Sequence, residues 1–241
     1  MALDGIFLNL LRQELCDALI GARVEKIYQP TREEVVIAFR GTAGNHRLLL
    51  SSKSSGARVH LTSLAVENPK QPPMLCMLLR KTIGSGRLVE IDQMGFERVL
   101  FFRFEATNEL GDPVTITLAA ELTGRNANLV LIGDDNKIID AVKRVGIDKS
   151  SVRQILPGLR YESPPPQRKL AITVGGKALF DELFASERDI SLNKRIGEVL
   201  EGASPLLCRE LCTAAGIEGD TVLSALTDPE KQSLLAALTT L

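Results

Sequence analysis

An acidic residue and an arginine stand side by side at the start of a predicted strand, in the sequence Gly95-Phe96-Glu97-Arg98. Neighbouring side chains of a strand point to opposite faces, so Glu97 and Arg98 are not expected simply to pair with each other. Arg98 can then meet a phosphate or a base edge, and Glu97 can accept a hydrogen bond from a base amino group. The alternative is an ordinary solvated pair of charges, which the spacing alone does not exclude.

A second polar cluster occupies residues 121–128, Glu-Leu-Thr-Gly-Arg-Asn-Ala-Asn. Gly124 allows a tight turn that brings Arg125, Asn126 and Asn128 close to backbone N–H groups. Such a surface could dock a polar partner. The alternative is a β-hairpin turn whose asparagines satisfy the local backbone.

Cations gather in residues 143–160, which hold five Lys and Arg side chains against Asp148 alone. The five are Lys143, Arg144, Lys149, Arg153 and Arg160. Because proteins hold nucleic-acid backbones chiefly through such cations, the first four predict a phosphate-facing patch. The alternative is a solvated loop.

Motifs of the common enzyme classes are missing from the sequence, which has no GxxxxGK[ST], HExxH or GxSxG and no GxGxxG after a strand. Only His46 and His60 could serve a catalytic triad, and each falls on a predicted strand. Four cysteines stand singly in apolar stretches without CxxC spacing, which predicts buried, reduced thiols; they are Cys16, Cys76, Cys208 and Cys212. We therefore expect no catalytic residues, no metal and no cofactor.

The composition is typical of a soluble globular protein, with 44% hydrophobic and 24% charged residues. An aromatic content of 4% with no Trp argues against binding single strands mainly by base stacking. The chain contains neither a secretory signal nor a run of about 20 apolar residues. These features predict a cytoplasmic protein with no membrane partner.

The net charge of −1 conceals an asymmetry along the chain. Residues 1–169 hold 23 Lys and Arg against 19 Asp and Glu, a net of +4. Residues 170–241 hold 6 against 11, a net of −5. Only the first part is therefore expected to face phosphate.

The pattern of residues predicts an α+β fold that is mainly antiparallel sheet. Helices are expected at 6–20, ended by Gly21, and at 75–83, ended by Gly84. Short β-rich segments separated by turn formers predict strands at 23–28, 34–40, 46–51, 57–62, 87–93, 97–106, 114–121, 128–132 and 137–142. Because helices do not alternate regularly with strands, a doubly wound parallel sheet is not expected.

The segment 155–168 carries four prolines and predicts a stiff, extended connector. We place the boundary between two domains at its end, giving domains of residues 1–169 and 170–241. The second domain is expected to be mostly helical. 

Two amphipathic helices are predicted within residues 192–216, with Ser204 as a possible N-cap and Pro205 at the first helical position. A second pair is expected from Asp220 to Leu241. Two short helix pairs with small-residue turns predict a helix-hairpin-helix module.

Several strings of the sequence resemble the NFACT-N domain in order and spacing, over nearly all of residues 1–169. They are LDGIFLNLLRQEL, KIYQP (26–30), PPMLCMLLRKTIGSGRL (72–88), ELTGRNANLVLI (121–132), IIDAVKRV (138–145) and ILPGLRYESPPPQRK (155–169). NFACT-N is the N-terminal domain of RqcH-like proteins, historically labelled fibronectin-binding protein A. The resemblance implies a fold like the N-terminal domain of formamidopyrimidine-DNA glycosylases. Residues 170–241 look like the helix-hairpin-helix region that follows it.

What the resemblance implies about function is larger than this chain. Full-length members bind large ribosomal subunits obstructed by peptidyl-tRNA, in the cytoplasm. They recruit tRNA, alanyl-tRNA in bacteria, and extend the stalled peptide without a template. No long heptad run occurs here, so their coiled coil and C-terminal domain are not expected, and the chain is expected to be a fragment.

The resemblance also implies site residues. The family's Asp-Arg pair, associated with tRNA engagement, falls on Glu97-Arg98, with Glu in place of Asp. The family's Glu-Ile-Met-Gly-Arg stretch falls on Glu121, Leu122, Thr123, Gly124 and Arg125, with Thr in place of Met.

Two other function classes compete with this interpretation. An adhesin that binds fibronectin needs an export route, and no signal segment is apparent in the sequence. A DNA glycosylase of the resembling fold needs an N-terminal proline amine as nucleophile. Here Met1 is followed by Ala2 and Leu3, so we expect glycosylase activity to be absent.

Overall fold

The computed structural model describes residues 3–41, 44–67, 69–185 and 188–240. Met1 and Ala2, on which the argument against a glycosylase depends, lie outside these ranges. The chain forms two compact units. Unit 1 consists of Phe7–Met94 and Arg98–Pro164, together with the described residue Leu3. Unit 2 consists of Pro165–Leu241 with two short upstream segments, Asp4–Ile6 and Gly95–Glu97. The division therefore falls inside the Pro-rich segment, before the predicted boundary at residue 169.

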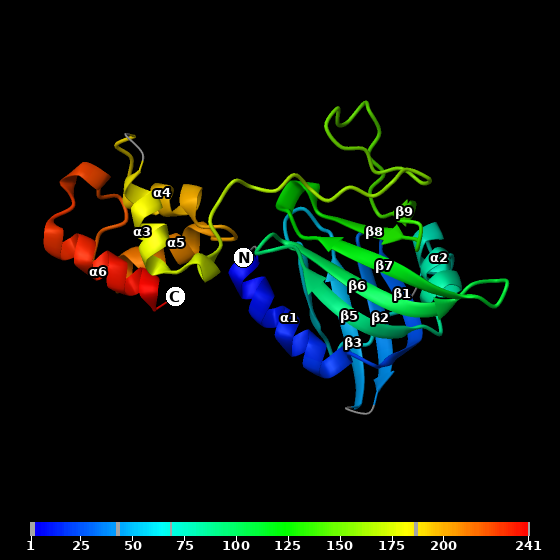
Figure 1. Cartoon of the computed structure of the whole chain (residues 1–241). Helices are drawn as coiled ribbons and strands as arrows, with labels where there is room; N and C mark the ends of the chain where they lie inside the picture. Colours follow the sequence, from blue (N-terminus) through cyan, green and yellow to red (C-terminus); the bar gives the residue numbers. More distant parts are fainter. Residues whose placement is uncertain (1–2, 42–43, 68, 186–187, 241) are drawn as a thin grey trace. The chain divides into compact units, whose positions relative to one another are not determined.

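Unit 1 is built mainly of antiparallel strands (Figure 1), as the sequence predicted. In the described part of the chain the strands are β1 (Arg23–Thr31), β2 (Glu34–Gly41), β3 (Gly44–Ser51), β4 (Arg58–Leu61), β5 (Arg87–Gln93), β6 (Val99–Thr107), β7 (Pro113–Glu121), β8 (Asn128–Ile132) and β9 (Ile138–Ala141). They form one sheet in the order β4-β3-β2-β1-β5-β6-β7-β8-β9. Short loops join most sequential neighbours because antiparallel strands need only a tight turn.

The sheet folds back on itself where β1 meets β5. Those two strands share one register pair, Arg23 with Arg87, whereas β6 and β7 pair along their whole length. Phe39 of β2 stacks on Phe104 of β6, with ring centroids 6.3 Å apart and planes 7° from parallel. The two halves of the sheet therefore face each other around a shared core, in which both rings are fully buried.

Two helices lie at opposite sides of this sandwich, α1 (Gly5–Leu19) and α2 (Met74–Ile83) (Figure 1). Their buried side chains join the central core, namely Leu8, Leu15 and Leu19 from α1 and Leu75, Cys76, Leu79 and Ile83 from α2. Gly21 follows α1 with φ +82°, which is the left-handed conformation expected of a residue that ends a helix. In the described ranges no helix combines the length and apolarity that a bilayer crossing needs.

Unit 2 is helical. Its elements are the 3-10 turns η2 (Ile172–Val174) and η3 (Leu223–Ala225) and the helices α3 (Gly176–Phe184), α4 (Leu192–Val199), α5 (Pro205–Ala214) and α6 (Asp228–Thr239). Ser204 caps α5, its side chain accepting a hydrogen bond from Leu207 N–H at 3.2 Å, and Pro205 takes the first position, as predicted. Thr227 and Glu230 form a reciprocal capping box at the start of α6.

The prediction of a first helix in the second pair is wrong, because a single 3-10 turn precedes α6 in its place. The backbone of residues 221–223 is occupied elsewhere: Thr221 C=O accepts from Leu192 N–H at 2.9 Å. Leu223 N–H donates to Ile190 C=O at 3.2 Å. These groups pair with a distant segment and are unavailable to a helical turn.

Glycines allow three segments of unit 2 to approach closely. Gly5 N–H donates to Gly202 C=O at 2.8 Å, and an added Cβ on Gly5 would lie 1.6 Å from Phe96 O. Gly202 has φ +74°, and its Cβ would lie 2.5 Å from the same oxygen. Phe96 N–H also donates to Glu201 Oε1 at 3.1 Å. A side chain at either glycine would therefore displace the Phe96 segment.

Gly202→Ala is expected to destabilise the protein more than the control Gly216→Ala. Gly216 has a similar φ of +71° with open space around its Cβ position, so it carries only the backbone cost of about 1–2 kcal/mol. Gly202→Ala adds an overpacking cost of about 1–3 kcal/mol. Urea unfolding followed by circular dichroism measures the free energy of unfolding of both variants. Equal losses of unfolding free energy would contradict the close approach of the Phe96 segment to Gly202.

Candidate functional site

One backbone hydrogen bond joins two of the predicted site segments in unit 1. Leu122 N–H donates to Arg98 C=O at 2.7 Å, which brings the turn after β7 to the start of β6. Gly124 has φ +66° and opens a 3-10 turn, η1 (Gly124–Asn126), as the predicted tight turn requires. Arg98, Thr123, Gly124 and Arg125 therefore lie in neighbouring loops.

The two arginines of this corner are available to a partner. Arg98 is half-buried and Arg125 is exposed. Neither side chain has a hydrogen bond or ion pair within the part of the chain that the structure describes. Guanidinium groups bind phosphate bidentately, so this corner could hold a phosphate.

Glu121 and Leu122 point into unit 1, at 1% and 2% exposure. The Glu121 carboxylate is held bidentately by Arg153, at 2.9 Å (Nη1–Oε2) and 2.5 Å (Nη2–Oε1). Tyr161 donates its hydroxyl hydrogen bond to Glu121 Oε1 at 2.9 Å. The structure thus places Arg153, predicted to face phosphate, in an internal ion pair with 15% of its side chain exposed.

The pKa values of Tyr161 and Arg153 are both raised in this cluster. Burial raises the pKa of Tyr161 well above its usual range, and the neighbouring Glu121 charge raises it further. Burial disfavours the charged form of Arg153, but the hydrogen bonds and charge of Glu121 outweigh it, so the pKa of Arg153 is raised. The cluster therefore keeps Arg153 charged and Tyr161 protonated.

Glu97 belongs to unit 2 and Arg98 to unit 1. The predicted strand is too long at this end, because β6 begins at Val99 and residues 95–98 form a turn that starts at Gly95 with φ +55°. Strand alternation therefore does not decide the directions of Glu97 and Arg98. Within unit 2 the Glu97 carboxylate accepts hydrogen bonds from Gln167, 3.0 Å from the backbone N–H and 3.5 Å from Nε2.

Three of the predicted phosphate-facing cations line one groove of unit 1 with a volume of about 740 Å³, namely Lys143, Arg144 and Lys149. Lys143 Nζ donates to Ser52 C=O at 2.7 Å and pairs with Glu33 at 2.9 Å. Arg144 holds Asp140 bidentately at 2.9 and 3.1 Å. Lys149 is exposed and has no partner among the described residues.

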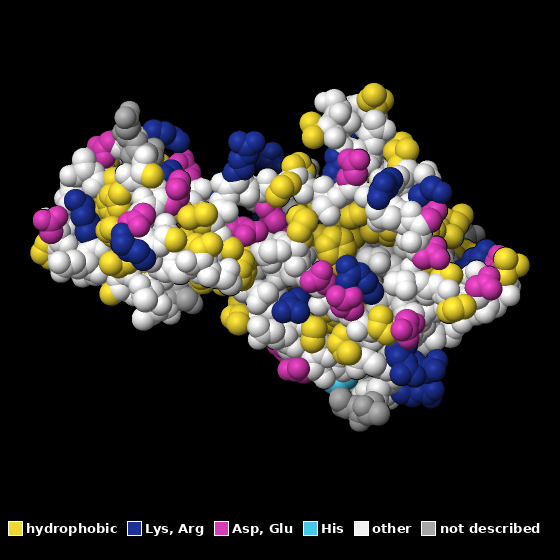
Figure 2. Space-filling model, in the orientation of Figure 1, with side chains coloured by type: hydrophobic (Ala, Val, Ile, Leu, Met, Phe, Trp, Pro, Cys, Tyr) yellow, Lys and Arg dark blue, Asp and Glu magenta, His cyan; other side chains and the backbone are white. Residues whose placement is uncertain are grey.

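Paired charges recur elsewhere on unit 1. Arg103 contacts Glu90 at 2.5 Å and Asp92 at 3.9 Å. Figure 2 shows Lys or Arg side chains adjoining Asp or Glu side chains over the middle of this unit. Cations that already have an acidic partner gain less from a phosphate than unpaired ones, so sequence clusters overstate the basic character of this surface.

Asn128 is buried and bonds to the backbone, but only one of its partners, Leu129, is local, as the hairpin-turn alternative predicted. It is 1% exposed, and its Oδ1 accepts from Leu129 N–H and Lys143 N–H, both at 2.9 Å. Its Nδ2 donates to Lys143 C=O at 2.8 Å. Asn128 thus ties β8 to the segment that follows β9.

No group of three or more His, Cys, Asp or Glu side chains within the described ranges is placed to hold a metal ion. The four cysteines are free thiols; Cys76, Cys208 and Cys212 are buried and Cys16 is partly exposed. Burial raises the pKa of the Cys212 thiol to about 11. Its reactive thiolate is therefore scarce at neutral pH.

The family model described as NFACT N-terminal and middle domains matches residues 4–241. The chain belongs to this family. It is 37% identical over 233 residues to the Rqc2 homolog RqcH of Bacillus subtilis, covering 92% of this chain and 39% of that protein. The archaeal Rqc2 homolog aRqcH of Methanocaldococcus jannaschii is 28% identical over 83% of this chain and 29% of its own length. The chain thus spans less than half of these relatives.

Two solved structures share the fold of this chain. The N-terminal part of the fibronectin/fibrinogen-binding protein of Streptococcus suis superposes with a TM-score of 0.82 and 34% identity. The match covers 98% of this chain and 84% of that one. The N-terminal domain of fibronectin-binding protein PavA of Streptococcus pneumoniae superposes with a TM-score of 0.79 and 32% identity. This match covers 86% of this chain and 77% of that one.

The sequence interpretation missed a second group of cations in this NFACT chain, on strands β1 to β3. They are Arg23, Lys26, Arg40 and Arg47. They do not form a run along the sequence, which is why a search for clusters passes over them. The signal that could have found them is their alternation with buried apolar residues, such as Val24 and Phe39.

Tyr161 is expected to stay protonated in the folded protein when the solution is made alkaline. Its pKa is raised by folding, so its contribution to stability is present below the unfolded tyrosine pKa of about 10 and declines as pH rises above it. Ultraviolet titration of tyrosinate should show Tyr161 ionising only as the fold is lost. Tyr161→Phe should remove that late step, and a Tyr161 signal that titrates while circular dichroism stays native would contradict the buried cluster.

Proposed function

We propose that this chain binds tRNA and the ribosome, as the N-terminal part of a ribosome-associated quality-control factor. Membership of the NFACT family supports the proposal, as do relatives named for ribosome quality control in bacteria, archaea and human. The whole protein would act in the cytoplasm on large subunits obstructed by peptidyl-tRNA. It would support template-independent alanine tailing, with alanyl-tRNA as the substrate in bacteria.

The observation that carries this proposal is the corner of unit 1 where Arg98 and Arg125 have no side-chain partner among the described residues. The Leu122–Arg98 backbone hydrogen bond fixes the two loops, so the guanidinium groups are presented from a positioned backbone. Glu97, the sequence neighbour of Arg98, would contribute a hydrogen-bond acceptor for the RNA. Its bond to the Gln167 backbone supports a defined direction for the carboxylate.

The remaining members of the predicted site would act indirectly or weakly. Glu121 and Leu122 are buried, so their role would be to hold the turn that carries Thr123, Gly124 and Arg125. Among the predicted phosphate-facing cations, Lys149 is available for a contact and Arg144 is 57% exposed although paired with Asp140. Lys143 and Arg153 are engaged in ion pairs.

We also propose that the chain acts by binding and not by catalysis, and that unit 2 is a helix-hairpin-helix module. Helices α4 and α5 are joined by residues 200–204, and Gly202 with φ +74° makes the turn. A short glycine-containing turn between two helices is characteristic of such hairpins.

A second candidate function is binding of fibronectin. Two structurally similar proteins carry that name, from Streptococcus suis and Streptococcus pneumoniae. Direct binding of immobilised fibronectin, measured beside tRNA binding on the same protein, separates the two. Competition between tRNA and fibronectin would indicate one shared surface.

Glu97→Ala/Arg98→Ala is expected to weaken tRNA binding about tenfold or more. Loss of charge-assisted hydrogen bonds costs about 1.5–3 kcal/mol, and 1.4 kcal/mol is a factor of ten. The control is Lys81→Ala/Glu109→Ala, which also removes one charge of each sign, from an exposed ion pair in unit 1 (60% and 76% exposed). Anisotropy of labelled tRNA gives both affinities.

Equal affinities of the two double variants would contradict the assignment of this site. The larger proposal has its own test, which is co-sedimentation of the full-length protein containing this chain with obstructed large subunits. Absence of the wild-type protein from the subunit fraction would contradict a ribosomal function.

A further inference from the structure

Unit 1 presents a second basic surface on the outer face of β1, β2 and β3, which we name the basic sheet face. It is defined by two rows of cross-strand neighbours, Arg23-Arg40-Asn45 and Lys26-Ala38-Arg47. Residues that alternate with them on β1 and β2, such as Val24 and Phe39, point into the core of the sandwich. The rows therefore face away from that core.

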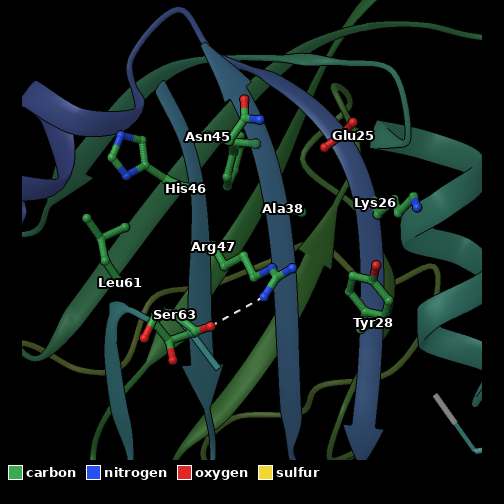
Figure 3. Close-up of a pocket in the computed structure, with 11 residues that line it drawn as sticks. Glu25, Lys26, Tyr28, Ala38, Asn45, His46, Arg47, Leu61 and Ser63 are labelled. Atoms are coloured by element: carbon green, nitrogen blue, oxygen red, sulfur yellow. Dashed lines mark hydrogen bonds between the residues drawn. The ribbon is translucent and has the colours of Figure 1, made fainter. Parts of the chain in front are cut away.

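The face is hollowed at its centre because Ala38 is small. A cavity of about 520 Å³ lies over it, with Lys26 and Tyr28 of β1 on one side and Arg47 of β3 on the other. Figure 3 shows Arg47 extending across β2 toward Tyr28. Ser63 C=O and Leu64 C=O hold the Arg47 guanidinium at 3.4 and 3.1 Å, which fixes its direction.

The cations of the basic sheet face are poorly neutralised. Arg23, Lys26 and Arg40 are exposed, and none has an ion pair or side-chain hydrogen bond within the described residues. Glu25 is the acidic member of the cavity lining. This differs from the groove around Lys143, where Lys143 and Arg144 already contact an acid.

The spacing of these charges suits a chain of phosphates better than a single anion. Adjacent strands are about 4.8 Å apart, so Lys26 on β1 and Arg47 on β3 are separated by about 10 Å at their backbones, with Ala38 between them. Arg23 and Arg40 continue the positive charge along the strands. Tyr28 adds a half-exposed aromatic ring beside the cations, and Asn45 adds an amide.

We propose that the basic sheet face binds the backbone of a single-stranded RNA segment, with one base against the Tyr28 ring. A cationic groove next to an aromatic ring is the usual arrangement for single strands. The ring and the amide favour RNA over an acidic peptide, which would use the cations alone. The inference rests on the proposed function for its ligand and adds a contact separate from Arg98 and Arg125.

The test compares two triple variants of this chain that lose the same charge. Arg23→Ala/Lys26→Ala/Arg40→Ala removes unpaired cations of the face. The control Lys81→Ala/Lys137→Ala/Lys177→Ala removes exposed cations that already pair with Glu109, Asp135 and Asp181. All six cations are exposed and lie outside the sandwich core, and circular dichroism checks that each protein is folded.

Binding of an unstructured RNA oligonucleotide is measured by anisotropy over a series of salt concentrations. Each phosphate contact contributes about 0.7 to the slope of log affinity against log salt for single strands, so the first variant should lower the slope by about 2. The control should keep the wild-type slope. Tyr28→Leu should weaken binding about tenfold while leaving the slope unchanged, because a stacking contact carries no charge.

Equal slopes for the two triple variants would overturn the inference, as would competition by polyglutamate as strong as that by RNA. The proposed function is judged separately by the Glu97/Arg98 variant in the same assay. If the Glu97/Arg98 variant loses RNA binding and the triple variant of the basic sheet face does not, the proposed function is supported and the inference about the sheet face is wrong. If wild-type protein binds no RNA, the inference fails, and ribosome co-sedimentation of the full-length protein then decides the proposed function.

Discussion

The ion pair between Glu121 and Arg153 is the constraint on which the turn that carries Arg125 and the segment after β9 depend. Glu121 ends β7, so fixing its carboxylate fixes where the following turn, with Arg125, begins. Arg153 belongs to the segment after β9, and the pair holds that segment against the sheet together with Tyr161. Removing one partner would leave an uncompensated buried charge, at a cost of about 3–5 kcal/mol. The pair therefore positions both segments although Glu121 is buried and Arg153 is only 15% exposed.

The cations of unit 1 fall into two classes, those paired with a carboxylate, like Arg153, and those without an acidic partner among the described residues. Arg153, Lys143 and Arg144 neutralise carboxylates of the fold, and their positive charge is largely compensated where they lie. Arg98 and Arg125 have no such partner in the described residues. A near-neutral protein can thus still present positive charge on its surface, because some cations are left uncompensated after folding.

Much of the fold could be predicted from the sequence because its signals are local. Alternation of apolar residues located the strands, and Gly21 and Ser204 marked a helix end and a helix start. The fate of Arg153 could not be predicted, since spacing does not reveal which cation meets a buried carboxylate 32 residues away. The helix predicted to include residues 221–223 was wrong for a similar reason, because the backbone hydrogen bonds of these residues go to residues 190–192. Long-range pairing overrides local propensity in both cases.

Two surfaces with unpaired cations on one unit would together raise the affinity of the chain for RNA. If Arg98 and the basic sheet face contact the same RNA, the second contact forms at the high effective concentration set by the first. Each surface can then be weak alone, as its few cations suggest, while the pair binds tightly. Because both belong to the same sandwich, their separation is fixed by the fold and the RNA must have the length and curvature to reach both. Selectivity for a shaped RNA would therefore arise from the geometry of unit 1, without hydrogen bonds that read base sequence.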